Sequence, residues 1–236
     1  LYSSAASDVY KRQRYLSGIA AGLNTKTNKI GYVAAMGLDN SEVTGGIDAF
    51  ALGIYSVNPD AEVYVKVTNS WYDPKAEEEA ARKLLDMNCD VIAQHCDTVY
   101  PQTLAQQKGV YSIGYNSDMS KEAPEACLCS VIWNWSAYYT SAVQSVIDGT
   151  WDGSNYYGGM NENLVSITPI ADFAAAATKE KVNMAKQQIL SGKNGVFDGV
   201  IETNTGATVG TAGKTLEDSV ITGGINWYFK TVSVIE

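Results

Sequence analysis

Aromatic and acidic side chains that could hold a flat ring follow several apolar segments of this 236-residue chain. Trp71 lies within Ser70–Pro74, His95 and Asp97 follow the next apolar run, and Asp118 follows the one after that. An indole stacks on a nucleobase with about 1–3 kcal/mol. Carboxylate oxygens accept hydrogen bonds from an exocyclic amine or a ribose diol. This pattern is therefore typical of a site for a purine base or nucleoside.

The same residues also permit structural roles. Trp71 could pack beside the start of a helix, and Asp73 could cap that helix. Two more tryptophans, Trp133 and Trp135, come shortly after Asp118 in the chain. We favour a binding cleft because several separate loops carry such residues, and ligands of parallel α/β sheets bind at the carboxyl ends of the strands.

The sequence offers little for catalysis. His95 is the single histidine, and His95, Cys96 and Asp97 are consecutive, so they cannot converge on one substrate atom from an extended segment. There is no G-x-S-x-G elbow and no phosphate-binding loop. Asp97 and Asp118, on adjacent strand ends, leave paired-carboxylate glycoside chemistry open. We expect no catalytic residue and no cofactor, so that the chain is not an enzyme.

Four cysteines raise the question of a metal site. Cys89, Cys96, Cys127 and Cys129 are present, and His95 could join three of them around zinc. No C-x-x-C or H-x-x-x-H spacing supports such a site, and buried free thiols are the better interpretation. Because Cys127 and Cys129 alternate as strand neighbours do, we expect both thiols on one face.

The composition limits the class of protein further. Hydrophobic residues make up 45% and charged residues 18% of the chain, as in globular proteins. The net charge of −9 argues against a nucleic-acid partner, since nucleic-acid binders present a basic face. The apolar runs are too short to span a membrane.

Residues 14–118 alternate between strand and helix patterns. This alternation predicts a parallel sheet wound by right-handed crossovers. Its strand-end loops are 37–42, 69–73, 95–101 and 115–119. The predicted strands are 29–36, 61–67, 89–94 and 109–114, and the predicted helices are 14–24, 42–57, 73–87 and 103–108.

The flanking parts are less regular. Residues 1–13 have neither an apolar period nor a cap, and they resemble translated sequencing-adaptor sequence, so we expect a non-native tail outside the fold. In the second half we predict a helix, a strand, a second helix, a hairpin, a short turn or helix, and a closing strand. These elements cover 133–147, 156–168, 178–190, 197–213, 216–221 and 227–234.

Several longer segments resemble one family. YLSGIAAGLNTKTNKIGY (15–32) resembles the core signature of the BMP (basic membrane protein) family, whose members are extracytoplasmic substrate-binding lipoproteins of ABC importers with a type I periplasmic binding protein fold. The resemblance covers residues 14 to about 234. Further matching segments are AFALGIYSVNPDAEV (49–63), NSWYDP (69–74), AQHCDT (93–98), GVYSIGYNSDMSKEAP (109–124), DGTWDG (148–153), FDGVIETNTG (197–206) and INWYF (225–229).

The resemblance implies binding without chemistry. Members of the family carry purine nucleosides or related bases to a membrane permease and its ATPase, and a lipid anchor at the N-terminus holds them outside the cytoplasm. By position, the ligand role falls on Trp71, His95, Asp97, Asp118 and Trp135, with Glu42 as a weaker addition. His95 could donate to or accept from a ring nitrogen, depending on its tautomer.

The resemblance also implies a domain organisation. Compared with the family pattern, the chain is truncated at its N-terminus and lacks the lipobox cysteine and most of the first lobe. We expect 14–132 to form the core of the second lobe, 133–160 to be a remnant of the first lobe, and 161–236 to return to the second. Half of the cleft would then be absent, so we expect weak ligand binding, exposed aromatic side chains and aggregation.

Two other functions remain open on the sequence alone. A ligand-sensing domain of a cytoplasmic transcriptional regulator shares the expected fold, and upstream sequence would separate it from an importer component. A nucleoside-processing enzyme would need a metal or an activated water, for which the sequence has no acidic cluster.

Overall fold

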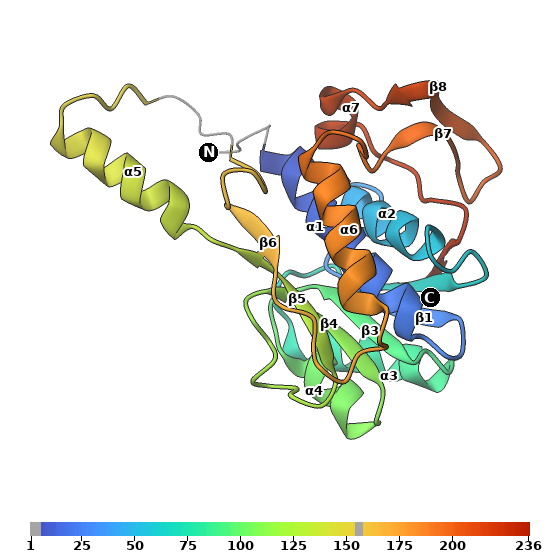
Figure 1. The fold of residues 1–236 in the computed structure, drawn as a ribbon. Coiled ribbons are helices and arrows are strands. Elements are labelled where there is room, and N and C mark those ends of the chain that lie inside the picture. The colour runs from blue at the N-terminus through green and yellow to red at the C-terminus, as the bar shows by residue number, and fades with distance from the viewer. Residues whose placement is uncertain (1–5, 154–157) are drawn as a thin grey trace.

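A computed structural model of the chain, which describes residues 6–153 and 158–236, consists of alternating strands and helices (Figure 1). The strands are β1 (Lys29–Ala34), β2 (Glu62–Val67), β3 (Val91–His95), β4 (Tyr111–Asn116), β5 (Cys127–Trp133), β6 (Val165–Ile167), β7 (Asp198–Glu202), β8 (Thr208–Thr215) and β9 (Val232–Ile235). The helices are α1 (Ala6–Asn24), α2 (Ser41–Tyr55), α3 (Pro74–Asp86), α4 (Tyr100–Gln107), α5 (Ser136–Ile147), α6 (Thr178–Leu190) and α7 (Asp218–Gly223). No helix within these residues is both long and apolar enough to cross a bilayer.

The main sheet has seven strands in the order β6-β5-β4-β3-β1-β2-β9. Its neighbouring strands are parallel, except that β5 and β6 are antiparallel. Helices α1, α2 and α6 lie on one face and α3 and α4 on the other (Figure 1). The expected α/β class with a parallel sheet wound by helices is confirmed, and the carboxyl ends of β1 to β5 lie along one edge.

Apolar side chains fill both faces of the sheet, as they must when helices cover both sides. Tyr32 of β1 packs with Ile47 and Phe50 of α2 on one face. Val33, the next residue, packs with Leu84 of α3 on the other face. All three of these elements therefore have fixed positions relative to the strand ends.

Helices α1 and α2 approach each other backbone to backbone. A Cβ at Gly18 would lie 2.1 Å from the carbonyl oxygen of Phe50, and a Cβ at Gly53 would lie 2.1 Å from the carbonyl oxygen of Tyr15. No side chain fits into either gap, so only glycine permits this contact. The contact fixes α1 over the sheet and brings its first half to the carboxyl edge.

The expectation that residues 1–13 lie outside the fold is wrong for part of that segment. Helix α1 begins at Ala6, and Lys11 and Gln13 are buried within the structure. The helical pattern that starts at Arg14 thus extends toward the N-terminus, where the Lys11 side chain lies against Gly45 of α2. The foreign origin of the segment stays a prediction, and residues 1–5 lie outside the described residues.

The second half differs from the prediction in three places, one of which is the closing strand expected over 227–234, because the strand β9 begins only at Val232. The strand expected over 156–168 is confined to β6, because 160–163 form a turn before it, and its first two residues lie outside the described residues. Trp133 ends β5 instead of opening a helix, and α5 begins at Ser136. The helix over 178–190 and the hairpin, now β7 and β8, are confirmed.

The expectation that Cys127 and Cys129 share a face is also wrong. The register between β4 and β5 shifts, so that Ser112 pairs with Cys127 and Ile113 with Cys129. The extra residue, Leu128, forms a bulge that rotates the strand. Cys127 consequently packs in the small cluster around Met119, whereas Cys129 belongs to the large core.

Helix α5 stands apart from the rest of the described chain (Figure 1). It has no buried residue, and Tyr139, Val143 and Ile147 are 57%, 59% and 72% exposed. Their spacing of four residues places them on one side of the helix. A helix of 12 residues is marginal in water without packing partners, so this apolar side favours association with another surface.

Self-association through α5 is therefore expected in solution. Replacing Val143 and Ile147 together by lysine should weaken it at least about tenfold, since each buried aliphatic side chain contributes about 1.5–3 kcal/mol. Analytical ultracentrifugation over a range of concentrations measures the change. Ser141→Lys, on the opposite side of the helix, is the control, and a concentration-independent monomer in the unaltered chain would contradict the expectation.

The contact between α1 and α2 gives a second prediction. Gly18→Ala should lower the free energy of unfolding by about 1–3 kcal/mol, because the added methyl group forces two helix backbones apart. Urea denaturation measures this change. Gly223→Ala, where a Cβ would meet nothing within 4 Å, is the matched control and should change stability by less than about 0.5 kcal/mol. Equal stability of the two variants would refute the proposed close contact.

Candidate functional site

The topology places all six predicted site residues at the carboxyl edge of the sheet. Each belongs to a strand end, to the loop that follows it, or to the first turn of the next helix. These residues are Glu42 after β1, Trp71 after β2, His95 and Asp97 at and after β3, Asp118 after β4, and Trp135 after β5.

His95 lies at the centre of an aromatic group. It is the last residue of β3 and is 1% exposed. The centroid of its ring lies 4.6 Å from that of Tyr115 and 5.8 Å from that of Trp71, both edge to face. Tyr32 Oη lies 3.3 Å from His95 Nδ1, where the donor depends on the histidine tautomer. Three neighbouring strand ends thus meet at one imidazole.

Arg14 reaches this aromatic group from α1. Its Nη1 donates to the carbonyl oxygen of Gln94 at 2.8 Å, and its guanidinium carbon lies 4.4 Å from the centroid of the Tyr115 ring. Nη2 is buried and has no hydrogen-bond partner among the described residues. Burial, and then the positive charge of Arg14, holds the pKa of His95 well below its usual range, so the imidazole is neutral at pH 7.

Trp71 and Asp97 are joined through the backbone. The amide of Asp97 donates to the carbonyl oxygen of Trp71 at 2.9 Å. Trp71 is half-buried, whereas Asp97 is exposed and its Oδ1 accepts from Asn116 Nδ2 at 3.4 Å. Desolvation by neighbouring groups raises the pKa of the Asp97 carboxyl, and the bond from Asn116 opposes the shift. The backbone therefore holds the segment that carries the indole next to the segment that carries the carboxylate.

Glu42 belongs to the same electrostatic environment. It occupies the first turn of α2 and is half-buried. Burial raises the pKa of its carboxyl, while the positive charges of Arg14 and Lys11 lower it by less. Glu42 is therefore connected to the aromatic group through the charge of Arg14.

Asp118 and Trp135 are not in contact with this group in the described part of the chain. Asp118 is exposed, and its Oδ1 accepts from the amide of Ser120 at 3.0 Å, as in a turn. Trp135 is 44% exposed and stacks on Trp133 with ring centroids 5.1 Å apart. The stack continues to Tyr139 at 6.0 Å. Four of the six predicted residues thus form one connected set, namely Glu42, Trp71, His95 and Asp97. The other two, Asp118 and Trp135, lie apart from it.

The arrangement suits recognition better than bond cleavage. A neutral buried imidazole supports aromatic rings, an indole offers a stacking surface, and a carboxylate offers hydrogen-bond acceptors. Four hollows of about 250–390 Å³ lie elsewhere on the described surface, and none of the four is lined by a predicted site residue. Burial of His95 favours a role beneath Trp71 and Tyr115 instead of direct ligand contact.

The cysteines do not assemble a metal site. All four are buried and free, and burial raises the pKa of Cys89 and of Cys96 to about 12. Such thiols stay protonated at neutral pH and are poor metal ligands. Among the described residues, no three His, Cys, Asp or Glu side chains are placed to hold a metal ion.

Sequence reasoning missed Arg14, Tyr32 and Tyr115. The two tyrosines interrupt strands that otherwise carry small or aliphatic residues at their buried positions, and Arg14 is a cation at the start of an apolar helical pattern. Each of these is a weak signal for a buried polar site. No pattern within the sequence connects the three, because β1, β4 and α1 meet only in the folded sheet.

Comparison with known proteins identifies the family. The model of the Bmp family, described as ABC transporter substrate-binding protein PnrA-like, matches residues 8–196. A purine-binding protein of Brucella abortus is 35% identical over 225 residues, which are 95% of this chain and 63% of that protein. A protein of Haloferax volcanii named as an ABC transporter glucose-binding protein is 38% identical over 186 residues, which are 79% of this chain and 47% of that protein.

Solved structures agree on the fold. An ABC transporter solute-binding protein from Conexibacter woesei superposes with a TM-score of 0.64 at 22% identity, over 78% of this chain and 62% of that one. A transcriptional activator of the comK gene from Bacillus halodurans superposes with a TM-score of 0.66 at 21% identity, over 77% of this chain and 63% of that one. The chain thus spans about half to just under two thirds of the curated relatives it matches.

The comparisons confirm the resemblance found in the sequence. The fold is that of periplasmic binding proteins, and the family consists of substrate-binding proteins and not of enzymes. This chain belongs to the Bmp family of PnrA-like ABC transporter substrate-binding proteins.

Proposed function

We propose that this chain forms one lobe of the substrate-binding component of an ABC importer and binds a purine base or nucleoside for delivery to the permease. The observation that carries the proposal is the joined pair Trp71 and Asp97, supported from beneath by His95 at the carboxyl edge of the sheet. The 35% identity to a purine-binding protein over 95% of the chain supports the ligand class.

Each residue has a distinct role in the proposal. The Trp71 indole stacks on the purine ring, and the Asp97 carboxylate accepts from an exocyclic amine or from the ribose diol. His95 holds the indole in place from below. Asp118 and Glu42 contribute acceptors at the rim, and Trp135 contacts the ligand from the far side.

The two separate members of the site are explained by two lobes. In the proposal, 14–132 and 161–236 form one lobe and 133–160 belong to the other, which the relatives' additional length supplies. The apolar side of α5 supports this division, because its residues Val143 and Ile147 are 59% and 72% exposed. Closure about a hinge then brings Trp135 toward Trp71.

The proposed partners follow from the family. They are a membrane permease and its ATPase, reached outside the cytoplasm, with an N-terminal lipid anchor preceding the residues of this chain. A nucleic-acid partner is not proposed, since the net charge is −9.

Two comparisons support a different ligand or a different function. The glucose-binding name of the Haloferax relative fits the same site chemistry, because sugars also stack on indoles and donate to carboxylates. The Bacillus halodurans activator shares the fold, so a sensor domain of a regulator is the second candidate function. Sequence upstream of this chain, either a lipobox or a helix-turn-helix, would discriminate between the two.

A ligand panel tests the proposal. The panel is adenine, adenosine, guanosine, inosine and glucose, applied to this chain alone and to a fusion with the part of the Brucella relative that it does not match. A purine at 100 times its Kd should raise the free energy of unfolding of the fusion by about 2.7 kcal/mol, and the chain alone should respond more weakly.

The panel has clear contrary outcomes. Stabilisation by glucose and by no purine would replace the ligand class with a sugar. No stabilisation of either protein by any compound would refute the binding role of this edge. Calorimetric titration of the same samples checks that the shifts reflect binding.

Removal of the indole tests the site itself. Trp71→Ala in the fusion should weaken purine binding by about 5- to 150-fold, the equivalent of the 1–3 kcal/mol that stacking contributes. Phe173→Ala is the matched control, because Phe173 is 40% exposed and stacks on Tyr111 at the opposite edge. Equal affinity of the two variants would exclude Trp71 from the site.

A further inference from the structure

A buried carboxylate lies directly beneath the loops that carry Trp71 and Asp97. Glu77 occupies the first turn of α3, next to the capping residue Asp73, and is 0% exposed. A charged group rarely occupies such a position without several partners. No part of the proposed ligand contact uses Glu77, so its burial requires another explanation.

Glu77 accepts hydrogen bonds from both loops. Its Oε1 accepts from the amide of Asp73 at 3.1 Å, in the loop that follows β2. Its Oε2 accepts from the amide of Thr98 at 3.2 Å and from Thr98 Oγ1 at 2.7 Å, in the loop that follows β3. One carboxylate therefore connects the segment of Trp71 with the segment of Asp97.

A pair of buried glutamines continues this connection to β4. Gln94 Nε2 donates to the carbonyl oxygens of Cys96 and Thr98 at 2.9 and 2.6 Å. Gln102 Nε2 donates to Gln94 Oε1 at 2.7 Å and to the carbonyl oxygen of Ile113 at 3.0 Å. The loop after β3 is consequently bonded on both sides, to Glu77 and to the neighbouring strand.

We propose that Glu77 is a positioning residue that fixes the distance between the Trp71 indole and the Asp97 carboxylate. This inference rests on the proposed function, in which those two groups bind the ligand. The bond from the Asp97 amide to the Trp71 carbonyl oxygen joins the loops near the ligand, and Glu77 joins them from below. Two links on different sides prevent one loop from rotating about the other.

The charge of Glu77 gives the link a pH dependence. The titratable groups that face it are Asp73 on its own helix, and Asp97 and the Cys96 thiol on the loop after β3. Burial raises the pKa of the Glu77 carboxyl, and the hydrogen bonds from Thr98 and Asp73 only partly oppose this. The joined arrangement is therefore favoured while Glu77 is protonated, and this contribution is lost as the pH rises through its pKa in the folded protein.

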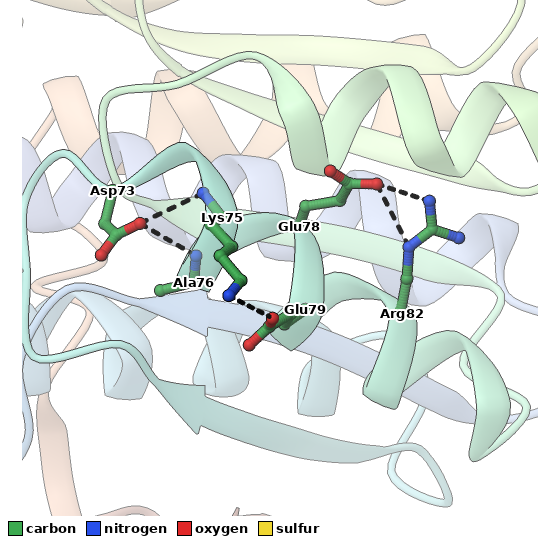
Figure 2. A network of polar contacts seen from close by, with 6 residues as sticks. All are labelled: Asp73, Lys75, Ala76, Glu78, Glu79 and Arg82. Carbon is green, nitrogen blue, oxygen red and sulfur yellow. Dashed lines mark hydrogen bonds and ion pairs between the residues drawn. The ribbon is translucent and has the colours of Figure 1, made fainter.

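The same helix provides control residues of the same type. Glu78 pairs with Arg82, and Glu79 pairs with Lys75 at 3.8 Å (Figure 2). The side chains of Lys75 and Glu79 are 87% and 67% exposed. Such exposed pairs contribute little to stability, so a change at Glu79 tests for effects of altering any acid on α3.

The first experiment measures loop order without ligand. In Glu77→Ala, hydrogen exchange at the amides of Asp73 and Thr98 should accelerate by about tenfold or more, because both lose a buried acceptor. Amides of β1 should be unchanged, which separates local loosening from unfolding. Glu79→Ala should exchange like the unaltered chain. Unchanged exchange at Asp73 and Thr98 in Glu77→Ala would overturn the proposal.

The second experiment uses an uncharged variant of the same shape. Glu77→Gln keeps the side-chain volume if the alanine variant fails to fold. As the pH rises across the carboxyl range, protection of the two amides in the unaltered chain should fall relative to Glu77→Gln, whose protection should stay flat after correction for intrinsic exchange. Parallel profiles in both proteins would overturn the positioning role, since a packing role alone has no such titration.

Ligand binding then separates the two proposals. In the fusion used for the panel, Glu77→Ala should weaken adenosine binding by about tenfold while Glu79→Ala does not. Absence of binding to the unaltered fusion would refute the proposed function and leave the exchange experiment valid. Binding that is equally tight in Glu77→Ala, despite faster exchange at its loops, would overturn the role of Glu77 in positioning.

Discussion

Buried polar groups beneath the carboxyl edge of the sheet must find partners inside the protein, and this constraint shapes the whole site. Arg14, Gln94 and Glu77 are almost completely buried, and an unpaired polar group there costs roughly 1–3 kcal/mol. Their hydrogen bonds run from α1 through β3 to α3. The aromatic side chains above them are held in position because the layer below has few alternative arrangements.

The strands and helices of residues 14–118 could be predicted because their signals are local. Apolar periods, the Asp73 cap and the proline after it fixed α3 to within one residue at each end. The extent of α1 could not be predicted, since Lys11 and Gln13 break the apolar period and become buried only in the fold, where the Lys11 side chain lies against Gly45 of α2. The bulge at Leu128 likewise depends on pairing with β4, which a single strand does not reveal.

The sequence predicted at which edge of the sheet the site residues lie, but not which of their side chains are in contact. Strand-end position is a topological property, so all six predicted residues lie at the same edge. The direction of a side chain does not follow from topology, and for this reason the sequence did not distinguish buried His95 from exposed Asp97. Glu77 was missed because its charge suggests a solvated face, whereas its spacing to Ala80, Ala81 and Leu84 places it on the buried side of α3.

The energy available at this edge also explains why the predicted residues do not all meet. Stacking on one indole contributes about 1–3 kcal/mol, whereas a micromolar complex requires about 8 kcal/mol. A single open edge therefore supplies only part of the affinity that an importer component needs. In the proposed function the rest comes from the other lobe, and Trp135, stacked on Trp133 just before the outlying helix α5, belongs to the segment that we assign to that lobe. In the proposed function, its separation from Trp71 is the geometry expected before closure, and desolvation and the second stacking face are gained only when the lobes close.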